Sequence, residues 1–454
     1  MEPSDALRVA VIGSGPAGIY TAQALIGQTR EPVAVDVIDR LPTPYGLVRY
    51  GVAPDHPTIK TIAAVLARVL EDPRVQFVGG VEFGRDVTRT DLAHAYHAVV
   101  YATGASTDRL MGIPGEELPG SIAAVDIVNW YSGHPDTGLG CFALDSEEVA
   151  VVGAGNVALD VVRVLSRTVD DLRRTDVPAP VLDALAASRI HRVHLVARRG
   201  PDRTRFSPKE LRELGRLPGV GIGVHPTDPP LSPSLAPEEM SRTARTNVRT
   251  LAEWARHPKE GVRRVELRFW RRPTAVLGTR RVEGLELEHT RLDDEGRLQG
   301  TGEREVLPVG MVVRSVGSVG RPLPGVPFDP VTATVPHDRG RALDSHGHPM
   351  HGEYVAGWLK RGAYGVIGTN KSDAAETARA LLEDAPMLRR TPPDVCADRM
   401  LADCGAATSS YTDWLDIDAA EAALARRLSR GERVKLCGWP ELLRAIGDRR
   451  HPGR

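Results

Sequence analysis

The fold of this 454-residue chain is decided by the run Val9-Ala10-Val11-Ile12-Gly13-Ser14-Gly15-Pro16-Ala17-Gly18. Its four apolar residues predict a buried strand, and the G-x-G-x-x-G spacing directly after them predicts a tight turn that opens a helix. In that setting Gly13, Gly15 and Gly18 allow the turn, the close approach of a pyrophosphate and close packing of helix on strand. Unpaired N–H groups at the helix start then face the phosphates. The run therefore predicts a dinucleotide-binding βαβ unit.

The same pattern occurs a second time. The strand-like run Val149-Ala150-Val151-Val152 leads into Gly153-Ala154-Gly155-Asn156-Val157-Ala158, with alanine in the last place. This is the G-x-G-x-x-A version of the same motif. Two such motifs indicate two dinucleotides, and the usual reason to bind two is to pass electrons between them.

The residues that end the next strand distinguish the two sites. After the first motif, the strand 33–38 ends at Asp39, 21 residues beyond Gly18. A carboxylate there accepts hydrogen bonds from a free ribose 2′-hydroxyl and repels a 2′-phosphate, which fits FAD or NAD. After the second motif, the strand 191–197 ends in Arg198-Arg199. Guanidinium groups grip phosphate oxygens, so this pair predicts NADPH, although two solvated arginines are the alternative in a chain rich in arginine.

Composition excludes several other classes of protein. The formal net charge is −1, which predicts no binding to nucleic acid or to a membrane surface, and no run of about 20 apolar residues predicts a membrane span. Only a dozen residues precede the first motif, so we expect a cytoplasmic protein or the mature form of an imported one. The four cysteines form no C-x-x-C pair, which argues against a flavin–dithiol relay and against an iron–sulfur or other metal site in this chain.

Further runs carry a resemblance to a known family. They are residues 41–49, 51–57, 153–160, 209–214 and 355–371. Together they resemble the adrenodoxin-reductase-like ferredoxin–NADP⁺ reductases, including bacterial members, in collinear order over nearly the whole chain. Asp39 is one methylene shorter than the glutamate usual in related flavoproteins, and Ser318 stands where an aromatic residue is often found.

The resemblance implies an α/β fold with two Rossmann-like domains, in which the NADP domain is inserted into a discontinuous FAD domain, as in glutathione-reductase-like architecture. We expect residues 1–105 and 332–454 to form the FAD domain, and residues 106–331 to form the NADP domain. Smaller expectations concern strands at 98–105, 311–316 and 353–357, a helix starting near 370–373, loops at 226–237 and 390–393, and tail helices near 419–430 and 441–446.

The resemblance also implies roles for individual residues. FAD would be bound by the residues of the first motif, including Ala17. It would also contact Asp39, Gly46, Leu47, Val81, Trp358, Gly365, Val366 and Ile367. NADPH would contact Arg109, Ala154, Gly155, Asn156, Val157, Arg198, Arg199 and Glu210. His56, Asp160 and Glu213 would lie near the stacked flavin and nicotinamide as the catalytic set. Plain structural alternatives stay open: Trp358 as a core aromatic, Arg109 as a surface arginine, His56 as part of a proline-rich loop, and Glu213 as a solvated charge.

The implied activity is that of an NADPH:ferredoxin oxidoreductase, acting as a monomer on a ferredoxin-type iron–sulfur protein that supplies, for example, a cytochrome P450. Because such partners are usually acidic, the helix-spaced Arg242, Arg245, Arg249 and Arg256 are the expected docking stripe, with an ordinary solvated helix face as the alternative. Three other classes remain as alternatives. They are an NADPH-dependent flavin monooxygenase or oxidase, a reductase subunit of the glutamate-synthase type, and a nucleotide sensor without enzymatic activity.

Overall fold

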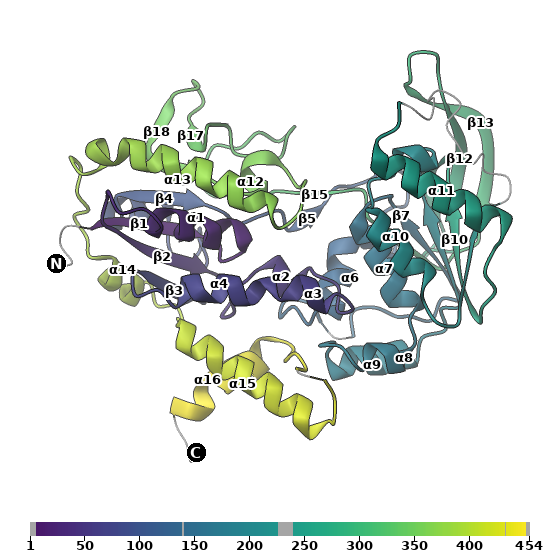
Figure 1. The fold of residues 1–454 in the computed structure, drawn as a ribbon, viewed down its shortest axis with the longest axis horizontal. Helices are drawn as coiled ribbons and strands as arrows, with labels where there is room; N and C mark the ends of the chain where they lie inside the picture. Colours follow the sequence, from purple (N-terminus) through teal and green to yellow (C-terminus); the bar gives the residue numbers. More distant parts are fainter. Residues whose placement is uncertain (1–5, 139, 226–238, 432, 451–454) are drawn as a thin grey trace.

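Two large sheets with parallel centres lie side by side in the computed structural model, which describes residues 6–138, 140–225, 239–431 and 433–450 (Figure 1). The first sheet has seven strands in the order β16-β17-β18-β4-β1-β2-β3, and the second has six in the order β6-β14-β7-β8-β10-β9. Each sheet contains one of the two predicted strand–turn–helix motifs, β1 with α1 in the first sheet and β7 with α7 in the second. The predicted loop at 226–237 lies outside the described residues.

The parallel part of the first sheet is made of strands that are largely buried on both faces. They are β1 (Leu7–Ile12), β2 (Val33–Asp39), β3 (Val75–Gly79), β4 (Ala98–Tyr101) and β18 (Pro349–Val355). One face packs on α1 (Pro16–Ile26), α4 (Ile62–Leu70) and α13 (Thr369–Leu388), and the other on α5 (Arg89–Ala95) and α14 (Ala397–Asp403). Burial on both faces explains why residues 9–12 of β1 and residues 98–101 of β4 read as continuous apolar runs. The strand β18 pairs in parallel with β4, although the whole second sheet lies between them in the sequence.

The second sheet is covered differently on its two faces. Its strands are β6 (Ser121–Ala123), β7 (Glu148–Val152), β8 (Arg192–Val196), β9 (Val220–Val224), β10 (Arg263–Arg268) and β14 (Met311–Arg314). One face packs on helices that include α6 (Ala124–Tyr131), α7 (Asn156–Ser166), α10 (Pro208–Gly215) and α11 (Arg242–Arg256). The other packs on an antiparallel sheet of β11 (Arg271–Leu277), β12 (Gly284–Leu292) and β13 (Leu298–Leu307). This small sheet was not predicted from the sequence.

The chain passes between the two large sheets twice, and the two crossings run together. β5 (Thr107–Asp108) on the outward crossing pairs antiparallel with β15 (Ser318–Val319) on the return. The chain therefore leaves the first sheet after β4 and enters the second at β6. It leaves the second sheet after β14 and returns to the first at β16 (His337–Asp338). The domain boundaries at residues 105 and 331 stay a prediction.

The predicted elements are present with altered ends. The strand expected at 311–316 stops at Arg314, ahead of Gly317 with its φ of +118°. The tail helix expected from residue 419 is α15 (Tyr411–Arg427), which starts earlier because Ser410 and Asp413 form a capping box. The helix expected at 441–446 is α16 (Trp439–Arg450), and 390–393 is a loop as predicted.

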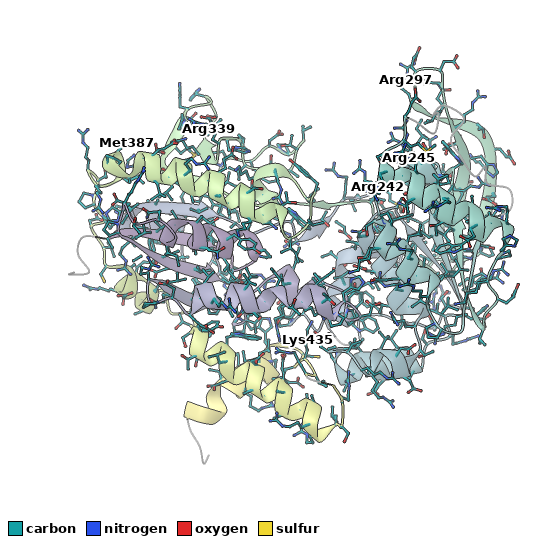
Figure 2. All side chains as sticks on the ribbon, in the orientation of Figure 1. Arg242, Arg245, Arg297, Arg339, Met387 and Lys435 are labelled. Atoms are coloured by element: carbon teal, nitrogen blue, oxygen red, sulfur yellow. The ribbon has the colours of Figure 1, made fainter. Side chains whose placement is uncertain are left out.

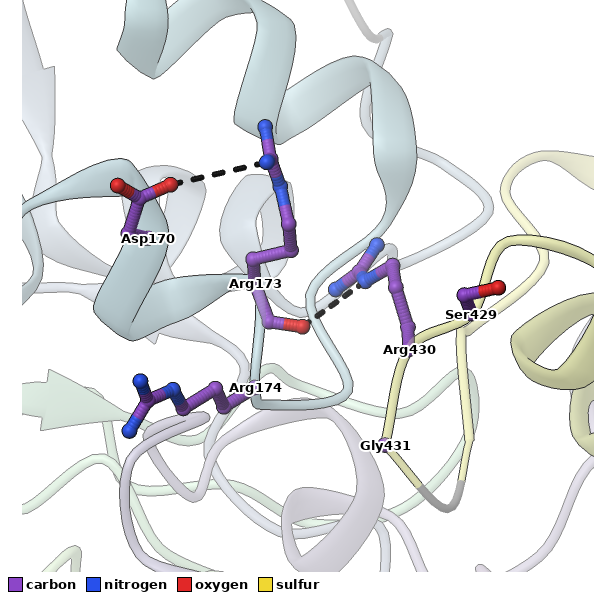
Figure 3. Close-up of a pocket in the computed structure, with 6 residues that line it drawn as sticks. All are labelled: Asp170, Arg173, Arg174, Ser429, Arg430 and Gly431. Atoms are coloured by element: carbon purple, nitrogen blue, oxygen red, sulfur yellow. Dashed lines mark hydrogen bonds and ion pairs between the residues drawn. The ribbon is translucent and has the colours of Figure 1, made fainter.

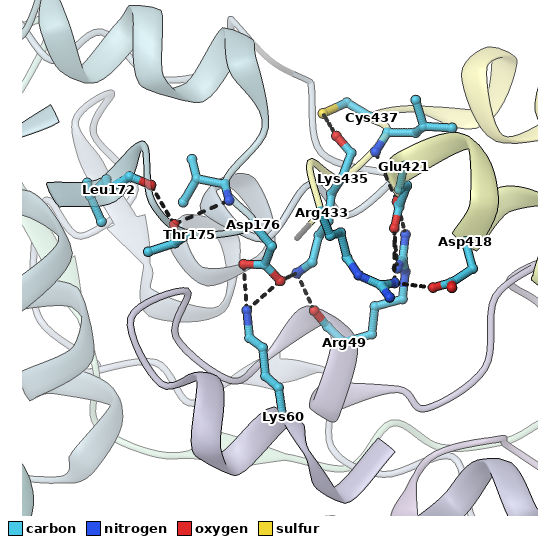
Figure 4. Close-up of polar contacts among 12 residues, drawn as sticks. Arg49, Lys60, Leu172, Thr175, Asp176, Asp418, Glu421, Arg433, Lys435 and Cys437 are labelled. Atoms are coloured by element: carbon cyan, nitrogen blue, oxygen red, sulfur yellow. Dashed lines mark hydrogen bonds and ion pairs between the residues drawn. The ribbon is translucent and has the colours of Figure 1, made fainter. Parts of the chain in front are cut away.

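The C-terminal tail connects the domain of the first sheet to the domain of the second through a buried polar network (Figure 4). The guanidinium of Arg49 donates to the Glu421 carboxylate of α15 at 3.1 and 2.5 Å, and both side chains are buried. Lys435 Nζ donates to the Arg49 carbonyl oxygen at 2.5 Å and lies 3.4 Å from Asp176 Oδ2, whose carboxylate also accepts from Lys60 at 2.6 Å. Burial, partly offset by Asp176, lowers the pKa of Lys435 to about 7.

Arg430 makes a second attachment of the tail. It donates to the carbonyl oxygens of Arg173, Thr175 and Val177 at 3.0, 3.0 and 2.7 Å. It thereby closes one side of an open pocket at this junction, where the Arg174 guanidinium points away from that of Arg430 (Figure 3). The cations of this pocket do not converge on one point, so we assign it a structural role only.

Candidate active site

The turn from Gly13 to Gly18 joins β1 to α1, and its three glycines are required for different reasons. A Cβ on Gly13, whose φ is +110°, would lie 2.5 Å from the carbonyl oxygen of Ala102, and a Cβ on Gly18 would lie 2.0 Å from that of Gly13. A Cβ on Gly15 would meet no atom within 4 Å. Gly15 therefore faces open space, where a pyrophosphate can approach the backbone and the start of the helix.

Asp39 lies beside this turn, at the end of β2. Its Oδ2 accepts from the N–H and the hydroxyl of Ser14, each at 2.7 Å, and its Oδ1 accepts from the Leu41 N–H at 2.9 Å. Because an ionised carboxylate has about four acceptor positions, Asp39 can hold the turn and still accept from a ribose hydroxyl. Gly46 rests on the same turn, since a Cβ placed there would lie 3.0 Å from the Cα of Gly15.

The structure restricts which group of Val81 could contact FAD. Val81 is buried, and its N–H already donates to the Asp39 carbonyl oxygen at 3.0 Å. Any contact between this segment and a cofactor would therefore use another group of Val81 or a neighbouring residue.

The predicted flavin-facing residues gather where α12 (Trp358–Arg361) and α13 begin. A Cβ on Gly357, whose φ is +75°, would lie 2.4 Å from the Cβ of Ala17, so α12 starts directly against α1. Trp358 is only half-buried, which does not fit a core aromatic, and Leu47 and Val366 are exposed.

Two backbone N–H groups near the start of α13 differ in availability. The Val366 N–H donates to Thr369 Oγ1 at 3.2 Å, whereas the Ile367 N–H makes no hydrogen bond within the described part of the chain. Gly365, with a φ of +89°, is exposed beside them. Of the three predicted contacts, Gly365 and Ile367 thus have N–H groups without a partner among the described residues, and that of Ile367 lies at the positive end of a 20-residue helix.

The second turn repeats the glycine geometry of the first. A Cβ on Gly153 would lie 2.2 Å from the Ser315 carbonyl oxygen, whereas a Cβ on Gly155 would meet nothing within 4 Å. Asn156, the first residue of α7, accepts from the Ser207 N–H through Oδ1 at 2.9 Å, and Val157 is exposed. Ala158 is fully buried in the place of the third glycine.

Unpaired arginines surround the second turn. Arg198 and Arg199 are exposed after β8, and their guanidinium groups make no hydrogen bond or ion pair within residues 6–138, 140–225, 239–431 and 433–450. Arg109 is exposed beside the β5–β15 pair, where its N–H donates to the Gly317 carbonyl oxygen. Sequence reasoning missed Arg205, an exposed residue whose N–H donates to the Ala154 carbonyl oxygen at 2.8 Å. The sequence did offer one indication of this residue, because Arg205 is a further arginine a few residues after the predicted pair Arg198-Arg199.

The three predicted catalytic residues lie together between the two sheets' domains. His56 precedes α3 (Pro57–Lys60), Asp160 belongs to α7, and Glu213 belongs to α10. His56 Nε2 lies 2.7 Å from Glu213 Oε2. The carboxylate of Glu210, predicted at NADPH, is buried 3.2 Å from the same nitrogen.

Arg163 of α7 holds this cluster together and was not predicted from the sequence. Its side chain is 0% exposed and donates to Asp55, Asp160 and Glu210 at 2.7 to 3.1 Å. Its Nη2 also lies 2.8 Å from His56 Nε2. The available signal was the i, i+3 spacing from Asp160, which places both side chains on one face of a helix.

Burial and Arg163 act on the two aspartates in opposite ways. Burial raises the pKa of Asp160 to about 6, because Arg163 and His56 offset it only in part. Burial acts on Asp55 too, but hydrogen bonds and charge from Arg163 and Arg167 lower its pKa to about 2. His56, Glu210 and Glu213 could together ligate a metal ion, yet the guanidinium of Arg163 already supplies positive charge 2.8 Å from two of them.

A helix was expected to carry four basic side chains for docking, and it is present. Arg242, Arg245, Arg249 and Arg256 all lie on α11 and are exposed. Figure 2 shows Arg242 and Arg245 near one end of this helix. The four cysteines are free thiols.

Comparison with known proteins gives similarity along the whole chain. The family model described as pyridine nucleotide-disulphide oxidoreductase matches residues 7–213. The NADPH-ferredoxin reductase FprA of Mycobacterium leprae is 41% identical over 461 residues, covering 98% of this chain and 99% of that protein. The mitochondrial NADPH:adrenodoxin oxidoreductase of Homo sapiens is 40% identical over 461 residues, covering 97% and 92%.

The solved structures agree with this result. The structure of Mycobacterium tuberculosis FprA in complex with NADPH superposes with a TM-score of 0.90 at 40% identity, covering 97% of this chain and 99% of that one. The predicted resemblance and the predicted two-domain α/β fold are thereby confirmed. By its end-to-end similarity to both, this chain belongs to the family of the NADPH-ferredoxin reductases and the NADPH:adrenodoxin oxidoreductases.

Proposed function

We propose that this chain is an FAD-dependent NADPH:ferredoxin oxidoreductase, with FAD on the turn around Gly15 and NADPH on the turn around Gly155. The observation that supports this proposal is that both glycine turns are open and that residues of opposite charge stand where each ribose would bind. Asp39 suits the free hydroxyl of FAD, and Arg198 and Arg199 suit the 2′-phosphate of NADPH. When bound, FAD accepts electrons as a pair from NADPH and releases them singly.

The chain's own residues bind and orient more than they do acid–base chemistry. The open turns bring both dinucleotides to helix N-termini, and the Ile367 N–H at the start of α13 favours negative charge beside it. His56, Asp160 and Glu213 lie where the two domains meet, in position to adjust charge and proton supply. Val81, Trp358 and Arg109 stay as proposed cofactor contacts.

The electron acceptor is proposed to be an acidic ferredoxin-type protein that docks on α11. Exposed arginines 242, 245, 249 and 256 give this helix a local positive field although the chain is nearly neutral overall. A monomeric state, a cytoplasmic location and a downstream cytochrome P450 remain predictions. Across the residues that the structure describes, no helix is both long enough and apolar enough to cross a membrane.

The oxygen-reacting monooxygenase or oxidase is not favoured, because the full-length relatives are named as ferredoxin and adrenodoxin reductases. The test is reduction of cytochrome c by the purified flavoprotein with NADPH, with and without an added ferredoxin, and with NADH as control. A large ferredoxin-dependent gain with preference for NADPH is expected. Flavin reduction without any gain from ferredoxin would contradict the proposed acceptor.

A further inference from the structure

Three groups compete for one nitrogen of His56. Nε2 lies 2.7 Å from Glu213 Oε2, 2.8 Å from Arg163 Nη2 and 3.2 Å from Glu210 Oε2. A ring nitrogen either carries a hydrogen and donates or is bare and accepts. A guanidinium only donates and an ionised carboxylate only accepts. Nε2 therefore cannot bond to Arg163 and to a carboxylate at once, and its own hydrogen decides which partner it has.

Arg163 can supply a hydrogen to His56 without leaving a buried carboxylate bare. Its Nη2 carries two hydrogens and faces three acceptors, His56 Nε2 at 2.8 Å, Asp160 Oδ1 at 2.7 Å and Asp55 Oδ1 at 3.1 Å. Asp55 is the acceptor that can be released, because its other oxygen accepts from Arg163 Nε at 2.8 Å and from Arg167 Nε at 3.0 Å. Asp160 then keeps the second hydrogen of Nη2.

Glu213 can give up Nε2 at low cost. Its side chain is 29% exposed, and its Oε1 lies 3.8 Å from Nζ of the exposed Lys209. A carboxylate at this position can turn to water and Lys209 when Nε2 has no hydrogen to offer. Glu210 differs, because it is buried and accepts from Arg163 Nη1 at 2.8 Å whichever partner Nε2 has.

We propose that Arg163 is a positioning residue that fixes the tautomer of His56. Arg163 donates to Nε2 of the neutral ring, so the neutral imidazole keeps its hydrogen on Nδ1. Glu213 accepts from Nε2 only after that nitrogen gains a proton. His56 itself contacts Arg163 of α7 and Glu210 and Glu213 of α10. The charged groups that contact these partners are Asp55 of its own loop, Asp160 of α7 and Lys209 of α10, and the Arg167 guanidinium reaches Asp55 but not His56.

The consequence is a constant donor on one side of the ring. Nδ1 makes no hydrogen bond to any residue that the structure describes, and it carries a hydrogen in both charge states. The proton that His56 gains or loses therefore passes through Nε2, on the side of Glu213 and water. That Nδ1 serves the bound flavin or nicotinamide rests on the proposed function, whereas the tautomer itself does not.

The tautomer can be read directly by ¹⁵N NMR of histidine-labelled holoenzyme, at a pH at which the ring nitrogen shifts report the neutral form. The wild type is expected to show His56 with its hydrogen on Nδ1, and Arg163→Met is expected to move that hydrogen to Nε2, facing Glu213. Arg167→Met is the matched control, because it loses a bond to Asp55 but has no contact with His56. A wild-type ring with its hydrogen on Nε2 would overturn the proposal.

A second variant covers the case in which Arg163→Met does not fold. Glu213→Ala removes the competing acceptor and is expected to leave the hydrogen of the neutral ring on Nδ1, whereas a hydrogen on Nε2 in this variant would show that Arg163 does not donate to that nitrogen. Flavin reduction by NADPH in Arg163→Met should slow roughly tenfold on the alkaline side only, the effect of one hydrogen bond. If the tautomers are as expected but the protein does not reduce ferredoxin, the proposed function is contradicted and the role of Arg163 at His56 still holds.

Discussion

Substitutions of single glycines are expected to distinguish the residues needed for ligand binding from those needed for stability at the two turns. Gly155 has a φ of −109° and open space around its missing Cβ, so Gly155→Ala is expected to fold with an unchanged thermal midpoint. The added methyl group blocks the approach of the pyrophosphate, and NADPH binding should weaken by at least about tenfold, or ~1.4 kcal/mol. Thermal unfolding and NADPH titration measure the two effects. Gly18→Ala is the contrasting variant, because its Cβ would lie 2.0 Å from the Gly13 carbonyl oxygen and should cost about 1–3 kcal/mol of stability.

The choice between NADPH and NADH is expected to depend on Arg198 and Arg199. Substituting either by alanine should weaken NADPH binding by about 1.5–3 kcal/mol and leave NADH binding nearly unchanged, because only NADPH carries the 2′-phosphate. Dissociation constants for both nucleotides give the measurement. Arg203→Ala is the matched control, since this nearby exposed arginine is paired with Asp202 at 3.3 Å. Equal losses for both nucleotides would contradict the predicted position of the phosphate.

Among the elements, α11 carries the prediction about the partner. Reversing two charges with Arg242→Glu and Arg249→Glu should raise the KM for ferredoxin and flatten its salt dependence, because steering by exposed charges is screened by salt. Steady-state rates at several ionic strengths check this. The double variant Arg304→Glu and Arg297→Glu on and beside β13 reverses the same number of exposed charges elsewhere. If both double variants behave alike, α11 is not the docking site.

The sequence predicted the elements whose signal is local and missed those that depend on partners far along the chain. The strands at both glycine motifs are recognisable because burial on both faces requires continuous apolar residues. The sheet of β11, β12 and β13 was missed, since β13 is largely exposed and rich in charged residues. Arg163 was missed for a similar reason: a lone arginine on α7 has meaning only once Asp55 and His56 arrive from the other domain.

For the molecule as a whole, the Asp55 carboxylate between the two domains contributes stability that is lost in acid. The pKa of Asp55 is lowered to about 2 from an ordinary 3.8. Its contribution is therefore fully present above pH 3.8 and is lost as the pH falls toward 2, and it amounts to about 2 kcal/mol at roughly 1.4 kcal/mol per pKa unit. Asp55→Asn should lower the thermal midpoint at neutral pH, and the difference from wild type should shrink in acid.

A matched exposed pair tests whether burial between the domains is the cause. Asp145 also binds an arginine through both oxygens, Arg281 at 2.8 and 3.0 Å, but on the surface. Asp145→Asn is expected to cost only about 0–1 kcal/mol, because exposed ion pairs contribute little. A loss in Asp145→Asn equal to that in Asp55→Asn would contradict the argument from burial.

The pairing of β18 with β4 also has a consequence for how the chain is made. While a ribosome is still synthesising residues 121–314, β4 has its N-terminal neighbour β1 but not its final partner. The nascent protein then exposes an open, apolar strand edge, of the kind on which unfinished chains aggregate. The first domain to emerge is thus the last to be completed, and folding in the cell should depend on chaperones or early flavin capture during that interval.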